Sequence, residues 1–447
     1  MAAASMRRVA VGATIGTVIE WYDFFLYNTA AALVFGRLFF PAQDATTGTL
    51  LAFATSATGF AARPLGAVVC GHFGDRIGRK SMLLATLLSM GGATIAIGLL
   101  PTYSSIGIAA PLMLVVLRLI QGFATGGEWG GAALMMIEHA TSRRGFWGSL
   151  ITSGIVLGLV LSSLAFMALG GLSEAEFLSW GWRVPFLLSA VLVLVGLYIR
   201  LQVSESPEFM RVEQAGQRSR APILDALRQP RGVLMIFLLR VAENFSFYIF
   251  SAFTLAYITR SLGLPRSLAL NAVLLAAAVE ALSAPLMGLA ADRIGARRVV
   301  MFGIAFQMLF AFPFFALLQS GSPVLIVLAV VIGFAVCNAA ISGPSPAYFA
   351  QFFGTRVRFS GISLGRETAT ILGGGLSPLI ATALLNWAGS TWPVAACMAG
   401  TSLLGLIAML VGRTVETGGT EPAYAAPVSA QPGLMAACPR RVCWIAW

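Results

Sequence analysis

Apolar runs of roughly 20 residues recur along the whole chain, and short polar stretches separate them. A helix of about this length crosses the roughly 30 Å hydrocarbon core of a bilayer. A transmembrane β-barrel would instead show segments of about ten residues with alternating hydrophobicity. With 58% hydrophobic and only 11% charged residues, the chain cannot cover a water-soluble surface, since soluble domains carry about a quarter charged residues. The pattern predicts an all-α membrane protein.

The apolar runs predict twelve transmembrane helices in two six-helix halves. The N-terminal half, 1–202, holds candidate spans at about 9–35, 49–71, 80–100, 110–136, 145–170 and 183–202. The C-terminal half, 232–412, holds candidate spans at about 232–259, 268–290, 299–318, 324–350, 361–386 and 391–412. A polar cytoplasmic linker, 203–231, joins the halves, and we expect the Gly/Pro-rich tail 413–447 to be disordered.

The basic residues fix the expected orientation. Most of the 29 lysines and arginines lie in the N-terminus, the linker, the tail and the loops that follow spans 2, 4, 8 and 10. The opposite side holds Arg37, Arg183, Arg260 and Arg266. Because cytoplasmic loops carry the excess of positive charge, both termini are predicted to be cytoplasmic, in an inner or plasma membrane. The net charge of +11 is thus a topology signal, and no nucleic-acid partner is expected.

A repeated motif marks corresponding places in the two halves. Residues 71–80 read GHFGDRIGRK and residues 288–298 read GLAADRIGARR, so both carry GxxxDRxG followed by basic residues. Small glycines let helix ends approach, and an aspartate there can accept hydrogen bonds from a facing helix N-terminus or an arginine. We therefore assign a cytoplasmic gate to Gly71, Gly74, Asp75, Arg76, Arg79, Asp292 and Arg293. The alternative, basic residues that serve topology alone, does not explain the repeated acid.

The loop at 71–80 resembles the signature loop of the major facilitator superfamily. Further segments resemble its metabolite:proton symporter branch, namely 20–24 (EWYDF), 63–66 (RPLG), 118–122 (RLIQG), 126–132 (GGEWGGA), 182–186 (WRVPF) and 205–209 (ESPEF). The resemblance implies a two-half transporter with its substrate site between the halves. It also implies proton-coupled movement of organic acids such as 2-oxoglutarate, citrate or shikimate, or of osmolytes such as proline and betaine.

Acidic residues inside the predicted spans are the candidates for proton coupling. Glu20 and Asp23 are three residues apart and so share one helical face, and neighbouring carboxylates titrate as a coupled pair. We assign Asp23 as the main proton carrier, with Glu20 coupled to it. Glu128, after two glycines in span 4, is a candidate second proton site or gate. The alternative is a fixed salt bridge from Asp23 to Arg63 or Arg118 that only holds helices together.

Arg63 and Arg118 are the leading candidates for contact with the cargo. A buried guanidinium stays charged and fits a carboxylate through two parallel hydrogen bonds. Alternatively, these arginines pair internally with Asp23 and Glu128, which leaves the cargo to Tyr, Asn and Gln side chains. The other candidate substrate-binding residues are Tyr22, Tyr27, Arg240, Glu243, Asn244 and Tyr248.

Three further ionisable residues in the second half have no assigned role. Glu280 is expected to be functional or paired, and Arg366 and Glu367 are expected near the cytoplasmic end of span 11.

The combined features favour an importer of an organic-acid anion, a dicarboxylate or a shikimate-like acid, by proton symport. Span 5 lacks the GxxxGPxxGG pattern of proton-coupled exporters, which favours import. The alternatives are a proline/betaine importer, against which the tail without heptads counts, and a non-transporting nutrient receptor. We expect a monomer in the lipid bilayer whose partners are a small molecule and protons. No motif indicates an enzyme, a metal site or an organic cofactor.

Overall fold

The computed structural model describes residues 2–41, 45–169, 171–217 and 219–411, so the predicted tail lies outside the described residues. This part of the chain is helical and contains no β-strand. The described residues all belong to one compact unit.

Long helices account for most of the described chain. In the first part they are α1 (Ala2–Ala30), α3 (Ala45–Ile77), α4 (Arg79–Leu99), α6 (Ala109–His139), α7 (Arg144–Met167) and α9 (Arg183–Leu201). After the linker they are α12 (Pro230–Tyr248), α14 (Arg266–Ile294), α15 (Ala296–Gln319), α16 (Pro323–Ile332), α19 (Arg358–Thr370), α20 (Ser377–Ala388) and α21 (Trp392–Val411). The shorter helices are α2 (Gly36–Phe39), α5 (Tyr103–Ile106), α8 (Glu174–Glu176), α10 (Pro207–Gln214), α11 (Pro222–Leu227), α13 (Thr254–Ala256), α17 (Ala339–Ser342) and α18 (Ser345–Phe349).

Several spans are built from consecutive helices joined by π-helical turns. Gly333–Asn338 joins α16 to α17, and Ile371–Gly375 follows α19 and leads into α20. Among the described residues, eleven helical stretches are long and apolar enough to cross a membrane. With α3, whose 33 residues exceed the length that a span needs, they make the twelve transmembrane helices that the sequence predicts. The all-α membrane fold is thereby confirmed.

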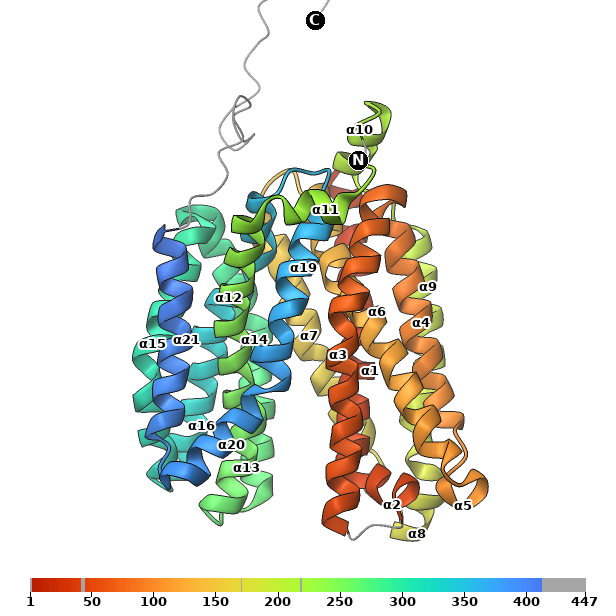
Figure 1. Cartoon of the computed structure of the whole chain (residues 1–447), viewed down its shortest axis with the longest axis vertical. Helices are drawn as coiled ribbons and strands as arrows, with labels where there is room; N and C mark the ends of the chain where they lie inside the picture. The colour runs from red at the N-terminus through yellow and green to blue at the C-terminus, as the bar shows by residue number, and fades with distance from the viewer. Residues whose placement is uncertain (1, 42–44, 170, 218, 412–447) are drawn as a thin grey trace, which may run out of the picture. The chain divides into compact units, whose positions relative to one another are not determined.

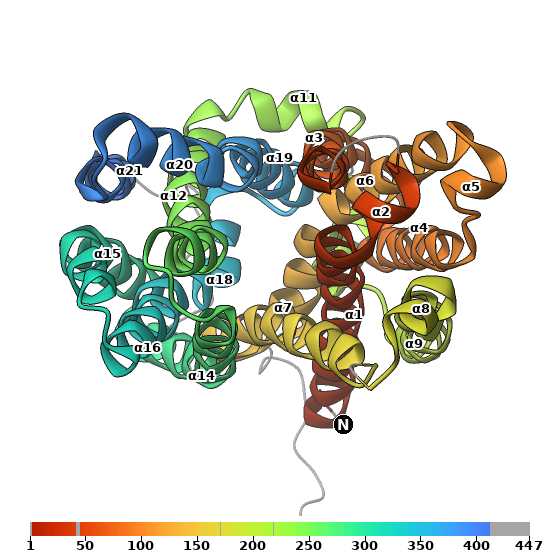
Figure 2. The same ribbon diagram turned by 90° about the horizontal axis from the view of Figure 1, so that it is seen from below.

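The helices gather in two groups (Figure 1). We call α1 to α9 the first helix group and α12 to α21 the second helix group. The groups meet where α7 packs against α14 and where α19 packs against α3 (Figure 2). The end of the helices that carries α10 and α11 is called the linker end below. The division into halves at 1–202 and 232–412 stays a prediction.

Glycines bring α3 and α6 into backbone contact. A Cβ atom on Gly66 would lie 1.9 Å from the carbonyl oxygen of Phe123, and one on Gly122 would lie 2.0 Å from that of Gly59. Only glycine fits such an approach, a packing mode common between membrane helices. This contact holds Arg63 of α3 and Arg118 of α6 at the core of the first helix group.

The predicted linker is more ordered than its polar composition suggests, since it contains α10 and α11. Ser206 caps α10 by accepting a hydrogen bond from the backbone N–H of Phe209, and Pro207 begins the helix. Serine followed by proline is a strong start signal for a helix. The linker therefore presents Glu205 and Glu208 in fixed positions at the ends of the membrane helices.

Candidate functional site

A cluster of arginines lies buried where the two helix groups face each other. Arg63 and Arg118 are almost completely buried, and the Arg63 Nε atom donates a hydrogen bond to Glu367 Oε2 of α19 at 2.8 Å. Arg366 forms an ion pair with the same carboxylate. The structure thus places Arg366 and Glu367 at the site, a role that the sequence alone did not assign to them.

Tyr248 of the second helix group lies close to this cluster. It is within electrostatic range of Arg63, Arg118 and Arg240, and its ring contacts that of Phe60 at a centroid distance of 6.1 Å. The structure therefore brings together Arg63 of α3, Arg118 of α6, and Arg240 and Tyr248 of α12, from three different helices.

Several guanidinium nitrogens of the cluster are left for a ligand. Among the described residues, Arg63 Nη1, Arg118 Nε and Nη2, and Arg366 Nε and Nη2 have no hydrogen-bond partner. The guanidinium of Arg118 lies 4.2 Å from the ring centroid of Tyr27 and 4.6 Å from that of Phe24. Aromatic faces stabilise a buried cation without using its N–H donors. The cluster can therefore receive a carboxylate through charge-assisted hydrogen bonds.

Internal pairing of these arginines with Asp23 and Glu128 does not occur in this structure. Arg63 bonds to Glu367, Arg118 Nη1 donates to Gln121 Oε1 at 3.1 Å, and Glu128 forms an ion pair with Arg200. Arg200, at the end of α9, is a partner that no motif in the sequence indicates.

The remaining substrate candidates have local partners. Arg240 and Glu243 form an ion pair one turn apart on α12, and Asn244 Nδ2 donates to Thr370 Oγ1 at 3.2 Å. The Tyr27 hydroxyl bonds to Thr55 Oγ1 at 2.5 Å, which leaves its ring against Arg118. The Tyr22 hydroxyl donates to the carbonyl oxygen of Pro185 at 2.8 Å, inside the first helix group and away from the cluster.

The three carboxylates assigned to proton coupling line one small pocket within the first helix group. Glu20, Asp23 and Glu128 surround it together with Thr86 and apolar residues of α1, α4 and α6. Ser189 donates to Asp23 Oδ1 at 2.5 Å. Among the described residues, Asp23 Oδ2 and both carboxylate oxygens of Glu20 have no hydrogen-bond partner. Buried carboxylates without full hydrogen bonding are suited to exchange protons.

The two GxxxDRxG motifs cap helices of the opposite group at the linker end. Asp75 accepts hydrogen bonds from the backbone N–H groups of Ser360 and Phe359, at 2.9 and 3.4 Å, at the start of α19. Asp292 accepts hydrogen bonds from Gly145 and Phe146, at 2.7 and 2.9 Å, at the start of α7. Each aspartate therefore uses the positive end of a helix dipole across the boundary between the groups.

The glycines of the first motif explain the close contact at this end. A Cβ atom on Gly74 would lie 2.2 Å from the Phe359 ring, and one on Gly71 would lie 2.9 Å from the Ser360 Cα atom. Arg79 is buried and contacts Asp75 at 3.2 Å and Glu138 at 3.5 Å. Arg76 and Arg293 are exposed, so the structure brings neither into these contacts.

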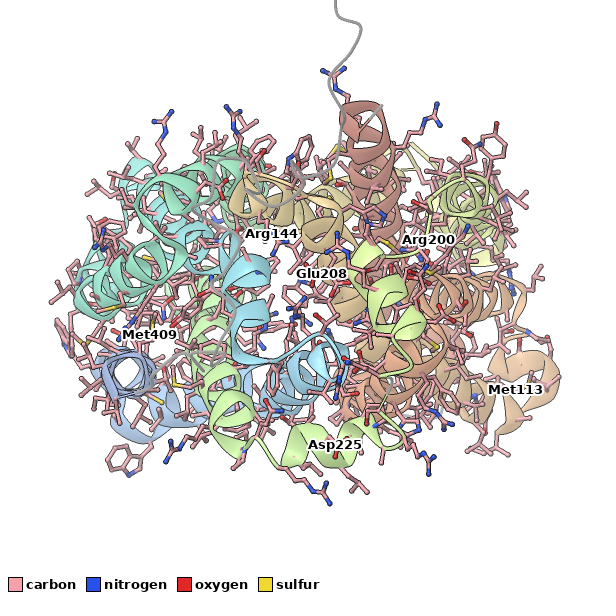
Figure 3. The ribbon with its side chains drawn as sticks, turned by 90° about the horizontal axis from the view of Figure 1, so that it is seen from above. Met113, Arg144, Arg200, Glu208, Asp225 and Met409 are labelled. Atoms are coloured by element: carbon pink, nitrogen blue, oxygen red, sulfur yellow. The ribbon has the colours of Figure 1, made fainter. Side chains whose placement is uncertain are left out.

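Two acidic residues of the linker, Glu205 and Glu208, also make contacts at the linker end. Their place in a polar stretch of the sequence indicates no such role. Glu208 pairs with Arg358 at 2.5 Å and with Arg144 at 3.1 Å, and Figure 3 shows Arg144 and Glu208 near each other. Glu205 accepts hydrogen bonds from the backbone N–H groups of Arg79 and Lys80, at 3.1 Å each, and so caps α4. Burial raises the pKa of Glu208, but Arg358 and Arg144 outweigh it and hold that pKa below its usual range.

Sequence profiles of two families match the chain. The profile of "Sugar (and other) transporter" matches residues 9–229, and that of "Major Facilitator Superfamily" matches residues 236–447.

Similar proteins of known name are membrane transporters. The shikimate transporter of Escherichia coli K12 is 44% identical over 91% of this chain and 94% of its own length. The inner membrane metabolite transport protein YhjE of the same organism is 40% identical over 90% of this chain and 94% of its own length. The proline/betaine transporter of that organism is 30% identical over 85% of this chain and 78% of its own length.

A solved structure shares the fold. The proton:xylose symporter XylE, bound to 6-bromo-6-deoxy-D-glucose, superposes with a TM-score of 0.72 at 15% identity, covering 92% of this chain and 95% of its own. The protein is thus a multi-pass membrane transporter. By profile, by relatives and by fold, the chain belongs to the major facilitator superfamily, among its metabolite transporters.

Proposed function

We propose that the protein is a secondary active transporter that imports a small organic-acid anion together with protons by alternating access. The observation that carries this proposal is the buried arginine cluster with unpartnered N–H donors, at the boundary of the two helix groups. A buried cation is costly unless a partner compensates it, and an anionic cargo supplies that partner.

The charges around Tyr248 favour an anion over a zwitterion. Arg63, Arg118, Arg240 and Arg366 face the carboxylates of Glu243 and Glu367, so positive charge is in excess. A monocarboxylate halves this excess of two charges, and a dicarboxylate cancels it. The 44% identity to a shikimate transporter supports a shikimate-like acid as the first candidate.

The pocket around Asp23 supports proton coupling. Its carboxylate shares the pocket with Glu20, and Glu20 lies within electrostatic range of Arg63. Protonation in this pocket therefore changes the field at the arginine that would hold the substrate. In the proposed mechanism Asp23 carries the proton, and Glu20 links the charge state of the pocket electrostatically to Arg63. Glu128 stays in its ion pair with Arg200.

The contacts at the linker end support a gate. Asp75 and Asp292 tie the groups together there, and the excess of basic residues supports a cytoplasmic location for this end. The structure then represents a state that is closed toward the cytoplasm. Release of substrate requires these contacts to break.

Uptake by purified protein in liposomes tests this function. Radiolabelled shikimate, 2-oxoglutarate, citrate and betaine are offered separately under a pH gradient that is acidic outside, with and without a protonophore. The account predicts protonophore-sensitive accumulation of at least one acid. Accumulation of betaine alone would instead support an osmolyte importer, as the 30% identical proline/betaine transporter suggests. Binding without flux would support a receptor.

A further inference from the structure

Glu280 is a buried carboxylate of the second helix group that the mechanism above does not use. It lies in α14, is only 1% exposed, and faces the span formed by α16, Gly333–Asn338 and α17. Asn338 Nδ2 donates to Glu280 Oε1 at 2.5 Å. Within the described part of the chain, Glu280 Oε2 has no hydrogen-bond partner, and neither does the hydroxyl of Ser342, which lies beside the carboxylate.

No cation neutralises this carboxylate. Among the described residues, no lysine, arginine or histidine lies within 4 Å of Glu280, and the charged group that acts on it is Glu243 of α12. Glu243 is itself paired with Arg240. The neighbouring elements α7 and α15 carry charge at Arg144, which pairs with Glu208, and at Arg297 and Arg298, which donate to backbone carbonyl oxygens of Met409 and Ile294. Near Glu280, α7 contributes the hydroxyls of Thr152 and Ser153, and α16 is wholly apolar.

The surroundings of Glu280 suit a protonated carboxyl group. An ionised carboxylate buried without a cation is strongly disfavoured, particularly at bilayer depth and near a second carboxylate. A protonated carboxyl group has one donor and retains acceptor capacity. Its Oε1 accepts from Asn338, and an Oε2–H can donate to the unpartnered hydroxyl oxygen of Ser342.

Helix α7 of the first helix group donates two hydrogen bonds to backbone carbonyl groups near Glu280. Thr152 of α7 donates to the carbonyl oxygen of Ser342 at 3.1 Å, and Ser153 donates to that of Ala281 at 2.8 Å. The first carbonyl group belongs to Ser342, which lies beside the Glu280 carboxylate. The second belongs to Ala281, which follows Glu280 in the chain. In the proposed alternating-access cycle the groups move against each other, so that both bonds would change with the state of the transporter. The environment of Glu280 therefore changes during the cycle, as a proton carrier requires.

We propose that Glu280, with Asn338 and Ser342, forms a second proton-binding site, so that the transporter moves two protons with each substrate molecule. One proton binds in the first helix group at Asp23 and the other in the second helix group at Glu280. Each proton is taken up outside and released inside, so no other reactant is needed. The inference rests on the proton symport proposed above.

The stoichiometry makes the proposal measurable with shikimate, which carries one carboxylate. Two protons and one monovalent anion move one net positive charge, whereas one proton and one anion move none. Without a pH gradient, an inside-negative potential set by potassium and valinomycin should then drive shikimate into wild-type proteoliposomes. About tenfold accumulation is expected at about 60 mV, since one charge gains about 2.3 kcal/mol per 100 mV.

Glu280→Gln keeps the shape of the carboxyl group and removes its proton exchange. This variant should lose the accumulation driven by potential and keep accumulation driven by a pH gradient. Glu174→Gln is the matched control, because Glu174 is an exposed residue paired with Arg37 at the protein surface, and it should behave as wild type. Potential-driven accumulation that persists in Glu280→Gln, or that is absent from the wild type, would overturn the second site.

An infrared measurement tests, without transport, whether Glu280 is protonated, which the second proton-binding site requires. The wild type should show the stretching band of a protonated carboxylic acid that Glu280→Gln lacks and Glu174→Gln retains. An unchanged spectrum, or shikimate uptake that depends on sodium through Glu280, would contradict the inference. Failure of any proton-driven uptake would instead refute the proposed function, and the infrared band would still test the site. If Glu280→Gln does not insert, the potential dependence of the wild type remains decisive.

Discussion

Arg63 is fixed through one nitrogen and keeps another for a ligand. Its Nε atom bonds to Glu367 at 2.8 Å, while Nη1 has no hydrogen-bond partner among the described residues. The rings of Trp21, Phe24 and Phe60 surround the guanidinium at 5.7 to 5.8 Å. These contacts hold the planar group in place before a substrate arrives, which lowers the entropy lost on binding.

Arg63→Lys tests whether the planar guanidinium matters. Lysine keeps the charge and loses the fork that holds Glu367 and a carboxylate together. We expect shikimate affinity to fall about tenfold or more, corresponding to about 1.4 kcal/mol. The measurement is the KM for uptake in proteoliposomes, with Arg211→Lys on the exposed surface of α10 as the control. A KM equal to that of the wild type would mean that Arg63 acts only as a point charge.

Asp23→Asn tests the assigned proton carrier. Asparagine can still accept the hydrogen bond from Ser189 and cannot exchange a proton. Exchange of labelled for unlabelled shikimate should continue, while accumulation under a pH gradient should fall at least tenfold, a loss of about 1.4 kcal/mol of coupling. Accumulation at the wild-type level would remove Asp23 from the coupling mechanism.

At this scale, the sequence identifies individual ionisable residues but does not reveal their partners. A charge within an apolar run marks Arg63 and Glu128 as costly and therefore significant. Their partners are Glu367, 304 residues away, and Arg200, 72 residues away. A spacing of three residues predicts that Glu20 and Asp23 share one helical face, and this prediction needs no knowledge of how the helices pack. Pairs between distant helices depend on packing that no local pattern encodes.

Helix ends are the elements that connect the two groups at the linker end. Asp75 of α3 caps the start of α19, and Asp292 of α14 caps the start of α7, so the same arrangement occurs twice. A capping carboxylate stabilises a helix N-terminus by about 0.5–2 kcal/mol. Together the two caps favour the state that is closed at this end.

Asp75→Ala should therefore shift the transporter away from the state closed at the linker end. We expect the turnover number to fall several-fold because the conformational balance is disturbed, with little change in equilibrium binding of shikimate. Parallel measurements of kcat and of binding in detergent separate the two effects. Asp225→Ala in α11 is the control, since that aspartate lies on the linker surface and bonds to Arg228 and Ser219. A weaker binding constant with normal kcat would contradict the gate assignment.

Glu208 gives these contacts a predictable pH dependence. Its pKa in the folded protein lies below the ordinary value because of Arg358 and Arg144. Its stabilising contribution is thus fully present above about pH 4.3, the ordinary pKa of glutamate, and is lost as the pH falls through the depressed folded-state pKa. The Tm of the wild type should fall more steeply below pH 4.3 than that of Glu208→Gln. Parallel Tm curves for the two proteins would show that Glu208 does not contribute.

At the scale of elements, hydropathy predicts the spans and misses details within them. The predicted span at 49–71 corresponds to α3, which extends from Ala45 to Ile77 and so includes the first GxxxDR motif. The linker was predicted only as a polar stretch, although Ser206 and Pro207 begin α10 within it. The π-helical turn Gly333–Asn338, which presents Asn338 to Glu280, has no sequence signature in this chain.

In the whole molecule, both helix groups contain buried ionisable residues. The first group holds Arg63, Arg118 and the carboxylate pocket, and the second holds Glu367 and the separate carboxyl group of Glu280. Contacts between the groups at the linker end involve Asp75 and Asp292. In the proposed mechanism, movement of one group against the other links substrate, protons and gate.

Detection of protons that enter with the substrate distinguishes proton symport from transport of the substrate alone. Wild-type proteoliposomes containing a pH-sensitive dye are mixed with shikimate without any imposed pH gradient, and the internal pH is followed. The account predicts internal acidification that starts with shikimate addition, disappears with a protonophore, and is absent from liposomes without protein. Labelled shikimate that enters down its gradient with no change of internal pH would contradict proton symport.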